Sequence, residues 1–205
     1  MKDLAEIVFI MDRSGSMETM RNEAVTGFNA FVEEQKKVPG EANLTLVLFN
    51  QAYEIPYSGK KLADVPPLTD KTYVPAGTTA LLDAVGRTID DLGKRLDGAP
   101  ESDRPTQVIV VVLTDGLENA SHDYRNDRIK AMIEHQQSKY SWKFLFLGAN
   151  QDAFETANGM GIPRAMSVNY SHTPDGYAQV YAATGQCVKK LRTTGKGTLS
   201  DPVGK

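Results

Sequence analysis

Short, strand-like runs of apolar residues recur along the chain. Residues 5–12, 107–115 and 143–150 are nearly continuous in apolar side chains, which is typical of strands buried on both faces of a parallel sheet. Residues 42–50 form a fourth strand-like run. The sequence therefore predicts at least four strands, three of them in the interior of a sheet.

Between these runs, apolar residues recur at three- and four-residue steps, the period of a helix with one buried face. Four such stripes lie at residues 20–32, 82–96, 129–133 and 177–191. The Thr-Pro pair at residues 173–174 supplies a cap residue and a first-turn proline for the last of them. Strands and helices thus alternate along the chain.

One strand is expected to run against the others. Residues 51–59 follow the strand of residues 42–50 almost at once, and so short a connection permits a hairpin but no parallel crossover. Pro56 within this segment favours the edge of the sheet. The pattern predicts an α/β fold with a doubly wound, mostly parallel sheet, one antiparallel edge strand and helices on both faces.

The length of 205 residues fits one domain with a sizeable core. We assign this domain to residues 1–192, and we expect residues 193–205, which are rich in Gly, Thr and Lys, to form a flexible tail. The only cysteine, Cys187, lies on the apolar stripe of the last helix. We therefore expect a buried thiol and no intramolecular disulfide.

Composition and charge exclude several classes of function. The net charge is −3, and the chain lacks the basic stripe that nucleic-acid-binding proteins carry, so we expect no nucleic-acid partner. No stretch of the sequence is long and apolar enough for a membrane span, and the N-terminal residues lack the pattern of a signal peptide. We therefore predict a cytoplasmic protein with no membrane partner.

Two of the predicted central strands end in aspartate, at Asp12 and Asp115. Ligands of open parallel sheets bind beyond the carboxyl ends of the strands, so we expect both carboxylates at one rim. Ser14 and Ser16 follow Asp12 on alternate residues, and Gly15 lets the backbone turn so that these oxygens can face one centre. Carboxylate and hydroxyl oxygens suit Mg²⁺ or Mn²⁺ better than zinc or copper.

The motif Asp-Arg-Ser-Gly-Ser-Met at residues 12–17 resembles the metal-ion-dependent adhesion site of von Willebrand factor type A domains, whose form is Asp-x-Ser-x-Ser. The family adds a threonine before a helix and an aspartate at the end of the fourth strand. Residues 75–86 and 110–116 are similar to those two elements. The resemblance extends over about residues 4–169 and implies a bound Mg²⁺, with Mn²⁺ as the alternative ion.

The resemblance implies a metal site made of five residues, Asp12, Ser14, Ser16, Thr79 and Asp115. The two serines and the threonine would bind the ion directly, and the two aspartates would hold metal-bound waters. Asp115 would reach the ion directly in another state. Thr78 adjoins Thr79, and both stay candidates; we choose Thr79 because the family's threonine usually directly precedes the small and apolar residues that open the helix.

Such a site leaves a divalent ion poorly neutralised at close range. Three neutral hydroxyls and two carboxylates leave an open position, which favours an anionic oxygen. In the family that oxygen typically belongs to a Glu or Asp side chain of another protein. The resemblance therefore implies a Mg²⁺-dependent protein-protein interaction module, and an AAA-type ATPase system is a candidate partner because many cytoplasmic relatives are thought to work beside one.

Two other functions compete with this hypothesis. Asp12 could serve a metal-dependent phosphohydrolase of the haloacid dehalogenase type, but that chemistry needs a second aspartate where this chain has Ser14. Neither serine of the motif lies in a Gly-x-Ser-x-Gly sequence, and His122 is the only histidine expected near the rim, so we predict no enzyme. The third hypothesis is a metal-free scaffold, against which the five filled positions argue.

Polar residues also follow the strand ends. For Glu118 and Asn119 we favour a loop that caps the next helix over a contact with a partner or a metal-bound water. Asn150 is a candidate for lining the crevice. Asp152 is predicted to cap a short helix at residues 153–159.

Overall fold

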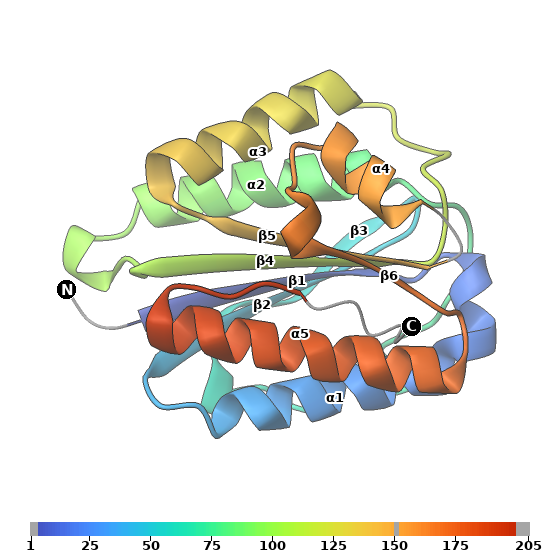
Figure 1. Cartoon of the computed structure of the whole chain (residues 1–205), viewed down its shortest axis with the longest axis horizontal. Helices are drawn as coiled ribbons and strands as arrows, with labels where there is room; N and C mark the ends of the chain where they lie inside the picture. The colour runs from blue at the N-terminus through green and yellow to red at the C-terminus, as the bar shows by residue number, and fades with distance from the viewer. Residues whose placement is uncertain (1–3, 150–151, 200–205) are drawn as a thin grey trace.

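A six-stranded sheet forms the middle layer of the protein (Figure 1). The computed structural model describes residues 4–149 and 152–199. The strands lie in the order β3-β2-β1-β4-β5-β6, and neighbours are parallel except for β2 and β3. They are β1 (Leu4–Asp12), β2 (Glu41–Phe49), β3 (Tyr53–Lys61), β4 (Gln107–Thr114), β5 (Lys143–Ala149) and β6 (Ser167–Tyr170). The mostly parallel sheet with an antiparallel edge strand is confirmed.

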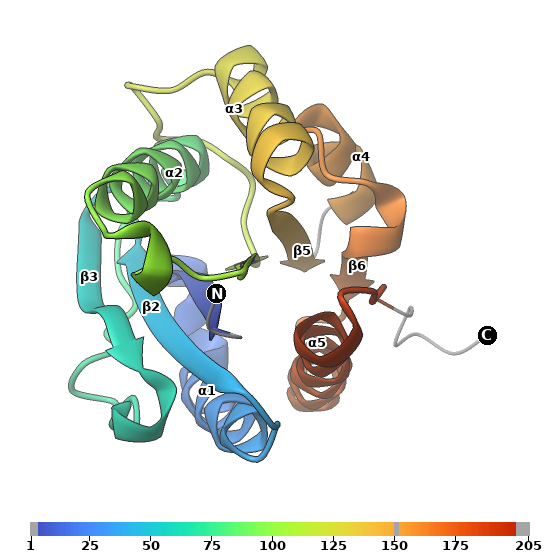
Figure 2. The same ribbon diagram turned by 90° about the vertical axis from the view of Figure 1, so that its left-hand side faces the viewer.

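Helices cover both faces of the sheet (Figures 1 and 2). One face carries α1 (Arg21–Lys36) and α5 (Pro174–Thr194), which pack against each other. The opposite face carries α2 (Leu81–Asp97), α3 (Asn126–Tyr140) and α4 (Ala153–Gly159). Among the described residues, no helix combines the length and the apolar character that crossing a bilayer requires.

The central strand β1 is buried on both faces, and its side chains alternate between two cores. Phe9 faces α1 and α5, where its ring lies 5.4 Å from the ring of Phe28, 5.4 Å from that of Phe31 and 6.0 Å from that of Tyr181. Ile10 belongs to the core under α2 and α3. The near-continuous apolar runs of the sequence therefore reflect burial of this sheet by two helical layers.

Several local predictions are confirmed. Asp152 caps α4 by accepting a hydrogen bond from the Glu155 amide at 3.0 Å, and Thr173 caps α5 by accepting one from the Gly176 amide at 3.1 Å. Cys187 is buried, and burial raises the pKa of its thiol to about 11. Strand β6 was not predicted, because four residues are too few to display a period.

The last helix is longer than the predicted domain. It continues past residue 192 to Thr194, and Gly195 ends it in the left-handed conformation with φ +69°. Leu199 is buried, and its amide donates a hydrogen bond to the Ala165 carbonyl at 2.9 Å. Leu199 therefore contacts the domain, while residues 200–205 of the predicted tail lie outside the described residues.

The strand order places a topological switch between β1 and β4. From β1 the chain builds β2 and β3 on one side, and it then returns to lay β4, β5 and β6 on the other. Crevices form at such a point, beyond the carboxyl ends of the strands. Asp12 ends β1 and Asp115 directly follows β4, so the fold brings both predicted carboxylates to the mouth of this crevice.

Two helical glycines offer a matched test of the packing between helix layers. A Cβ added at Gly27 in α1 would overlap the ring of Tyr181 in α5, whereas one added at Gly93 in α2 would meet no atom within 4 Å. We expect Gly27→Ala to lower the free energy of unfolding by about 1–3 kcal/mol through overpacking. Gly93→Ala should raise it by up to about 1 kcal/mol through helix propensity. Urea unfolding measures both, and equal effects at the two sites would contradict the close α1–α5 contact.

Candidate metal centre

Asp12 is a carboxylate buried at the end of the central strand, with no exposed surface. One of its oxygens accepts a hydrogen bond from the Ser14 amide at 2.7 Å, and the other accepts one from the Thr114 hydroxyl at 2.6 Å. The Tyr73 hydroxyl donates to the Asp12 carbonyl at 2.6 Å. Burial raises the pKa of Asp12 to about 6, against the lowering effect of the bonds from Thr114 and Ser14. The site therefore holds a desolvated charge that hydrogen bonding offsets only in part.

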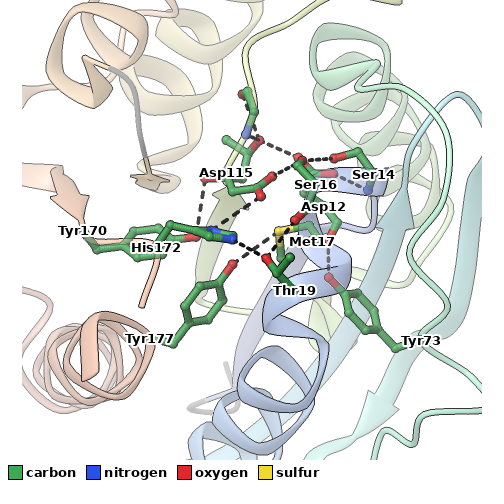
Figure 3. Close-up of polar contacts among 12 residues, drawn as sticks. Asp12, Ser14, Ser16, Met17, Thr19, Tyr73, Asp115, Tyr170, His172 and Tyr177 are labelled. Atoms are coloured by element: carbon green, nitrogen blue, oxygen red, sulfur yellow. Dashed lines mark hydrogen bonds and ion pairs between the residues drawn. The ribbon is translucent and has the colours of Figure 1, made fainter. Parts of the chain in front are cut away.

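The two serines of the motif connect this carboxylate to the end of β4 (Figure 3). The hydroxyl oxygens of Ser14 and Ser16 lie 3.1 Å apart, and the Ser16 hydroxyl donates to Oδ1 of Asp115 at 2.7 Å. Ser14 is buried, whereas Ser16 is exposed. Burial also raises the pKa of Asp115, and the hydrogen bond from Ser16 and the nearby His172 oppose this shift. Two carboxylates of raised pKa thus share one cluster with two hydroxyls.

Thr79 completes the cluster, and Thr78 does not. A Cβ placed on Gly116 would lie 3.1 Å from the hydroxyl oxygen of Thr79 and 3.8 Å from that of Ser16, so both hydroxyls border the same small space. Thr79 is buried, whereas Thr78 is exposed. The structure therefore brings all five residues predicted for the site to one rim, from three separate segments of the chain.

The loop before α2 is held against the motif by backbone hydrogen bonds. The Gly15 amide donates to the Gly77 carbonyl at 3.0 Å, and the Ala76 amide donates to the Arg13 carbonyl at 2.8 Å. Gly77 has φ +77°, a conformation that favours glycine. These bonds fix where Thr79 lies relative to the serines.

Glu118 and Asn119 lock the loop that follows β4. Glu118 accepts hydrogen bonds from the Leu82 amide at 2.9 Å and from the hydroxyl and amide of Ser121, both at 2.7 Å. Asn119 accepts one from the Thr79 amide at 2.9 Å and returns one to the Thr79 carbonyl at 3.1 Å. The capping role is right in kind for Glu118, but the helix that it caps is the preceding α2 rather than the next helix. Asn119 caps no helix and instead binds Thr79, before α2.

His172 joins the site without having been predicted. It lies between β6 and α5, and its Nδ1 is 3.5 Å from Oδ2 of Asp115 (Figure 3). No motif in the sequence links residues 115 and 172, so only the three-dimensional fold reveals the contact. His122, by contrast, is exposed, and its amide donates to Asp83 on α2. Asn150 lies outside the described residues.

The residues that meet here fit a hard divalent cation. Three hydroxyls and two carboxylates supply only oxygen, which Mg²⁺ and Mn²⁺ prefer. A cation would also offset the two buried negative charges that burial and proximity make unfavourable. Within residues 4–149 and 152–199, no group of three or more His, Cys, Asp or Glu side chains could hold a metal ion.

Comparison with solved structures identifies the fold. The sequence itself matches no protein-family model and no curated protein. The chain is similar to proximal thread matrix protein 1 from the mussel byssus (14% identity, TM-score 0.61), over 91% of this chain and 46% of that one. It is also similar to the ArnB paralog VWA2 from Sulfolobus acidocaldarius (17% identity, TM-score 0.58), over 91% and 45%.

A third similar structure is a von Willebrand factor type A protein from Catenulispora acidiphila, at 16% identity and a TM-score of 0.56 over 90% of this chain and 42% of that one. The class is thus a doubly wound α/β domain, and the chain has the fold of von Willebrand factor type A domains. It spans less than half the length of each of these structures. One structure of the mussel protein carries a MIDAS motif, the metal-ion-dependent adhesion site, occupied by zinc.

The buried charge of Asp12 predicts how the stability of the metal-free protein depends on pH. A carboxyl whose pKa is higher in the folded state favours folding while it is protonated. Its contribution is therefore full below about pH 4 and is lost as the pH rises through about 6. At about 1.4 kcal/mol per pKa unit, this loss is on the order of 3 kcal/mol.

We therefore expect Asp12→Asn to be more stable than the wild type at pH 7 in EDTA, and about equal to it at pH 4. Urea unfolding at both pH values measures the difference. The same variant should gain little stability from added Mg²⁺, because it lacks the charge that the ion offsets. An Asp12→Asn protein that is less stable than the wild type at pH 7 in EDTA would contradict the dominance of the desolvated charge.

Proposed function

We propose that the protein is a Mg²⁺-dependent interaction module that binds a carboxylate of a partner protein. The ion would be held by Asp12, Ser14, Ser16, Thr79 and Asp115. The observation that carries this proposal is the meeting of three hydroxyls and two buried carboxylates of raised pKa at the switch point of the sheet. When bound, the ion would supply an electrophilic centre for an anionic oxygen.

The accessibility of the cluster supports docking from outside. Ser16 is exposed while Asp12, Ser14 and Thr79 are buried. The candidate site is therefore closed to solvent on one side and open on the side of Ser16. Mg²⁺ demands near-octahedral oxygen ligands and usually keeps waters that a stronger anionic ligand can replace. A Glu or Asp of a partner that approached this open side would bind only when the ion is present.

The choice of Mg²⁺ rests on the donor set. All five side chains offer oxygen, and oxygen-only sites favour Mg²⁺ or Mn²⁺ over zinc. The zinc-occupied motif of the mussel protein makes a divalent ion a natural candidate here, and zinc belongs among the ions to be measured. The AAA-type partner system and the cytoplasmic location stay predictions from the sequence.

A binding role fits the surroundings of Asp12 better than a catalytic one. A phosphohydrolase would need this carboxylate as an accessible nucleophile, yet the residue has no exposed surface and both of its oxygens already accept hydrogen bonds. Ser14 occupies the place of the second acid and cannot transfer a proton at neutral pH. We therefore propose that the protein is not an enzyme.

The test begins with calorimetry of Mg²⁺, Mn²⁺ and Zn²⁺ binding to the wild type and to Ser14→Ala. We expect the wild type to bind, and we expect the variant to lose more than about tenfold in affinity because it lacks a direct ligand. Ser138→Ala, at an exposed serine of α3, is the matched control. Partners captured by the wild type should be released by EDTA and should be absent with Ser14→Ala.

Two outcomes would contradict the proposal. Partners that persist equally in EDTA and with Ser14→Ala would exclude docking through an ion. Turnover of a phosphate or ester substrate by the wild type that vanishes in Asp12→Ala would favour the enzyme hypothesis instead.

Leu117 offers a separate test of the partner contact. Its side chain is 66% exposed, two residues beyond Asp115, and the bonds of Glu118 and Asn119 fix the loop that carries it. Burying a leucine contributes about 1.5–3 kcal/mol. We therefore expect Leu117→Ser to weaken partner binding roughly 10- to 100-fold while the Mg²⁺ affinity stays unchanged.

Calorimetry and quantitative pull-down measure the two affinities for this variant. Tyr140→Ser is the control, because Tyr140 is 52% exposed and lies at the end of α3 that precedes β5, away from the site. Equal partner binding by Leu117→Ser and the wild type would show that the partner does not cover this side of the site.

A further inference from the structure

The imidazole of His172 reaches the candidate metal site from a fourth segment of the chain. Its Nδ1 lies 3.5 Å from Oδ2 of Asp115, and its Nε2 lies 2.9 Å from the Thr19 hydroxyl (Figure 3). The side chain is 16% exposed. Nδ1 is buried and makes no hydrogen bond with any described residue, and a buried polar atom in that state calls for a partner. The carboxylate of Asp115 is the acceptor placed to serve it.

Two elements hold the ring in this position. Thr19 belongs to the short 3-10 helix η1 (Gly15–Met20), which also carries Ser16. On the other side, the ring packs edge-on against Tyr177 in the first turns of α5, with ring centroids 5.7 Å apart. The imidazole is therefore oriented by contacts that do not involve the carboxylate.

The chemistry of the neighbouring groups indicates which ring nitrogen would carry the proton. An ionised carboxylate can only accept a hydrogen bond, so Nδ1 can pair with Asp115 only when Nδ1 carries the ring proton. The Thr19 hydroxyl lies 2.9 Å from Nε2 and can either donate or accept. With the ring proton on Nδ1, this hydroxyl donates to Nε2.

Both carboxylate oxygens of Asp115 therefore have a neighbouring hydrogen-bond donor. Oδ1 accepts from the Ser16 hydroxyl at 2.7 Å, and Oδ2 faces the ring nitrogen. A carboxylate that accepted a hydrogen bond on each oxygen could not rotate freely, so Oδ1 would stay beside the serine hydroxyls. Groups that orient a metal-binding carboxylate in this way commonly change metal affinity 10- to 100-fold.

We propose that His172 is the positioning residue of Asp115, and that it acts by donating from Nδ1 to Oδ2 and so keeps Oδ1 turned toward the ion. The inference rests on the proposed function, because it assigns a role within that metal site. It adds the connection between β6 and α5 to the three segments that build the cluster.

A matched set of variants separates this role from simple packing. The amide nitrogen of an asparagine at 172 can take the place of Nδ1, whereas that of a glutamine takes the place of Nε2. Both variants lose the ring contact with Tyr177. We expect His172→Asn to keep the Mg²⁺ and Mn²⁺ affinities within about threefold of wild type, and we expect His172→Gln and His172→Ala to lose 10- to 100-fold.

Calorimetry measures these affinities, and His135→Asn, at an exposed histidine of α3, should behave as the wild type does. Equal affinities in all the His172 variants would overturn this inference and leave the proposed metal site standing. A glutamine variant that outperforms the asparagine one would also overturn it, because the ring would then act through Thr19. A wild type that binds no divalent ion would overturn both proposals.

Discussion

The candidate metal site depends on a negative charge at the end of the central strand, on a side chain with no exposed surface. Asp12 has no exposed surface, and desolvation raises its pKa to about 6 although two hydrogen bonds stabilise the ionised form. A buried carboxylate is tolerated only when its surroundings compensate for the lost hydration. The loops around the end of β1 are therefore best understood as the partners of this charge.

Hydrogen bonds tie those loops to the rest of the fold. The loop before α2 is tied to the motif through Gly15 and Gly77, and the loop after β4 is tied to α2 through Glu118 and to Thr79 through Asn119. Each tie fixes a segment that contributes an oxygen to the cluster. When the loops of a site are already ordered before the ligand binds, no binding free energy is lost to ordering them.

The sequence predicted the parts of this arrangement that leave a periodic or local signal. Buried strands, amphipathic helices and the cap of α5 at Thr173 each depend on residues close in the chain. Asp12, Ser14 and Ser16 form a spaced motif, Asp115 lies at a strand end, and Thr79 was proposed from the resemblance to von Willebrand factor type A domains. The role of Glu118 was assigned to the wrong helix, since its partner Leu82 lies 36 residues away. His172 and β6 were missed for a related reason, because a contact between residues 115 and 172 and a four-residue strand leave no pattern to detect.

The balance of charge within the cluster explains why an open position matters. Two carboxylates match the charge of a divalent ion only if both lie in direct contact with it. Both oxygens of Asp12, however, already accept hydrogen bonds from Ser14 and Thr114. In the proposed site, hydroxyls would then be the nearest protein ligands, and they carry no net charge. An ion held in this way would keep part of its positive charge on the side where Ser16 is exposed. The same hydrogen bonds that make a buried aspartate tolerable would therefore leave the ion attractive to a carboxylate from outside.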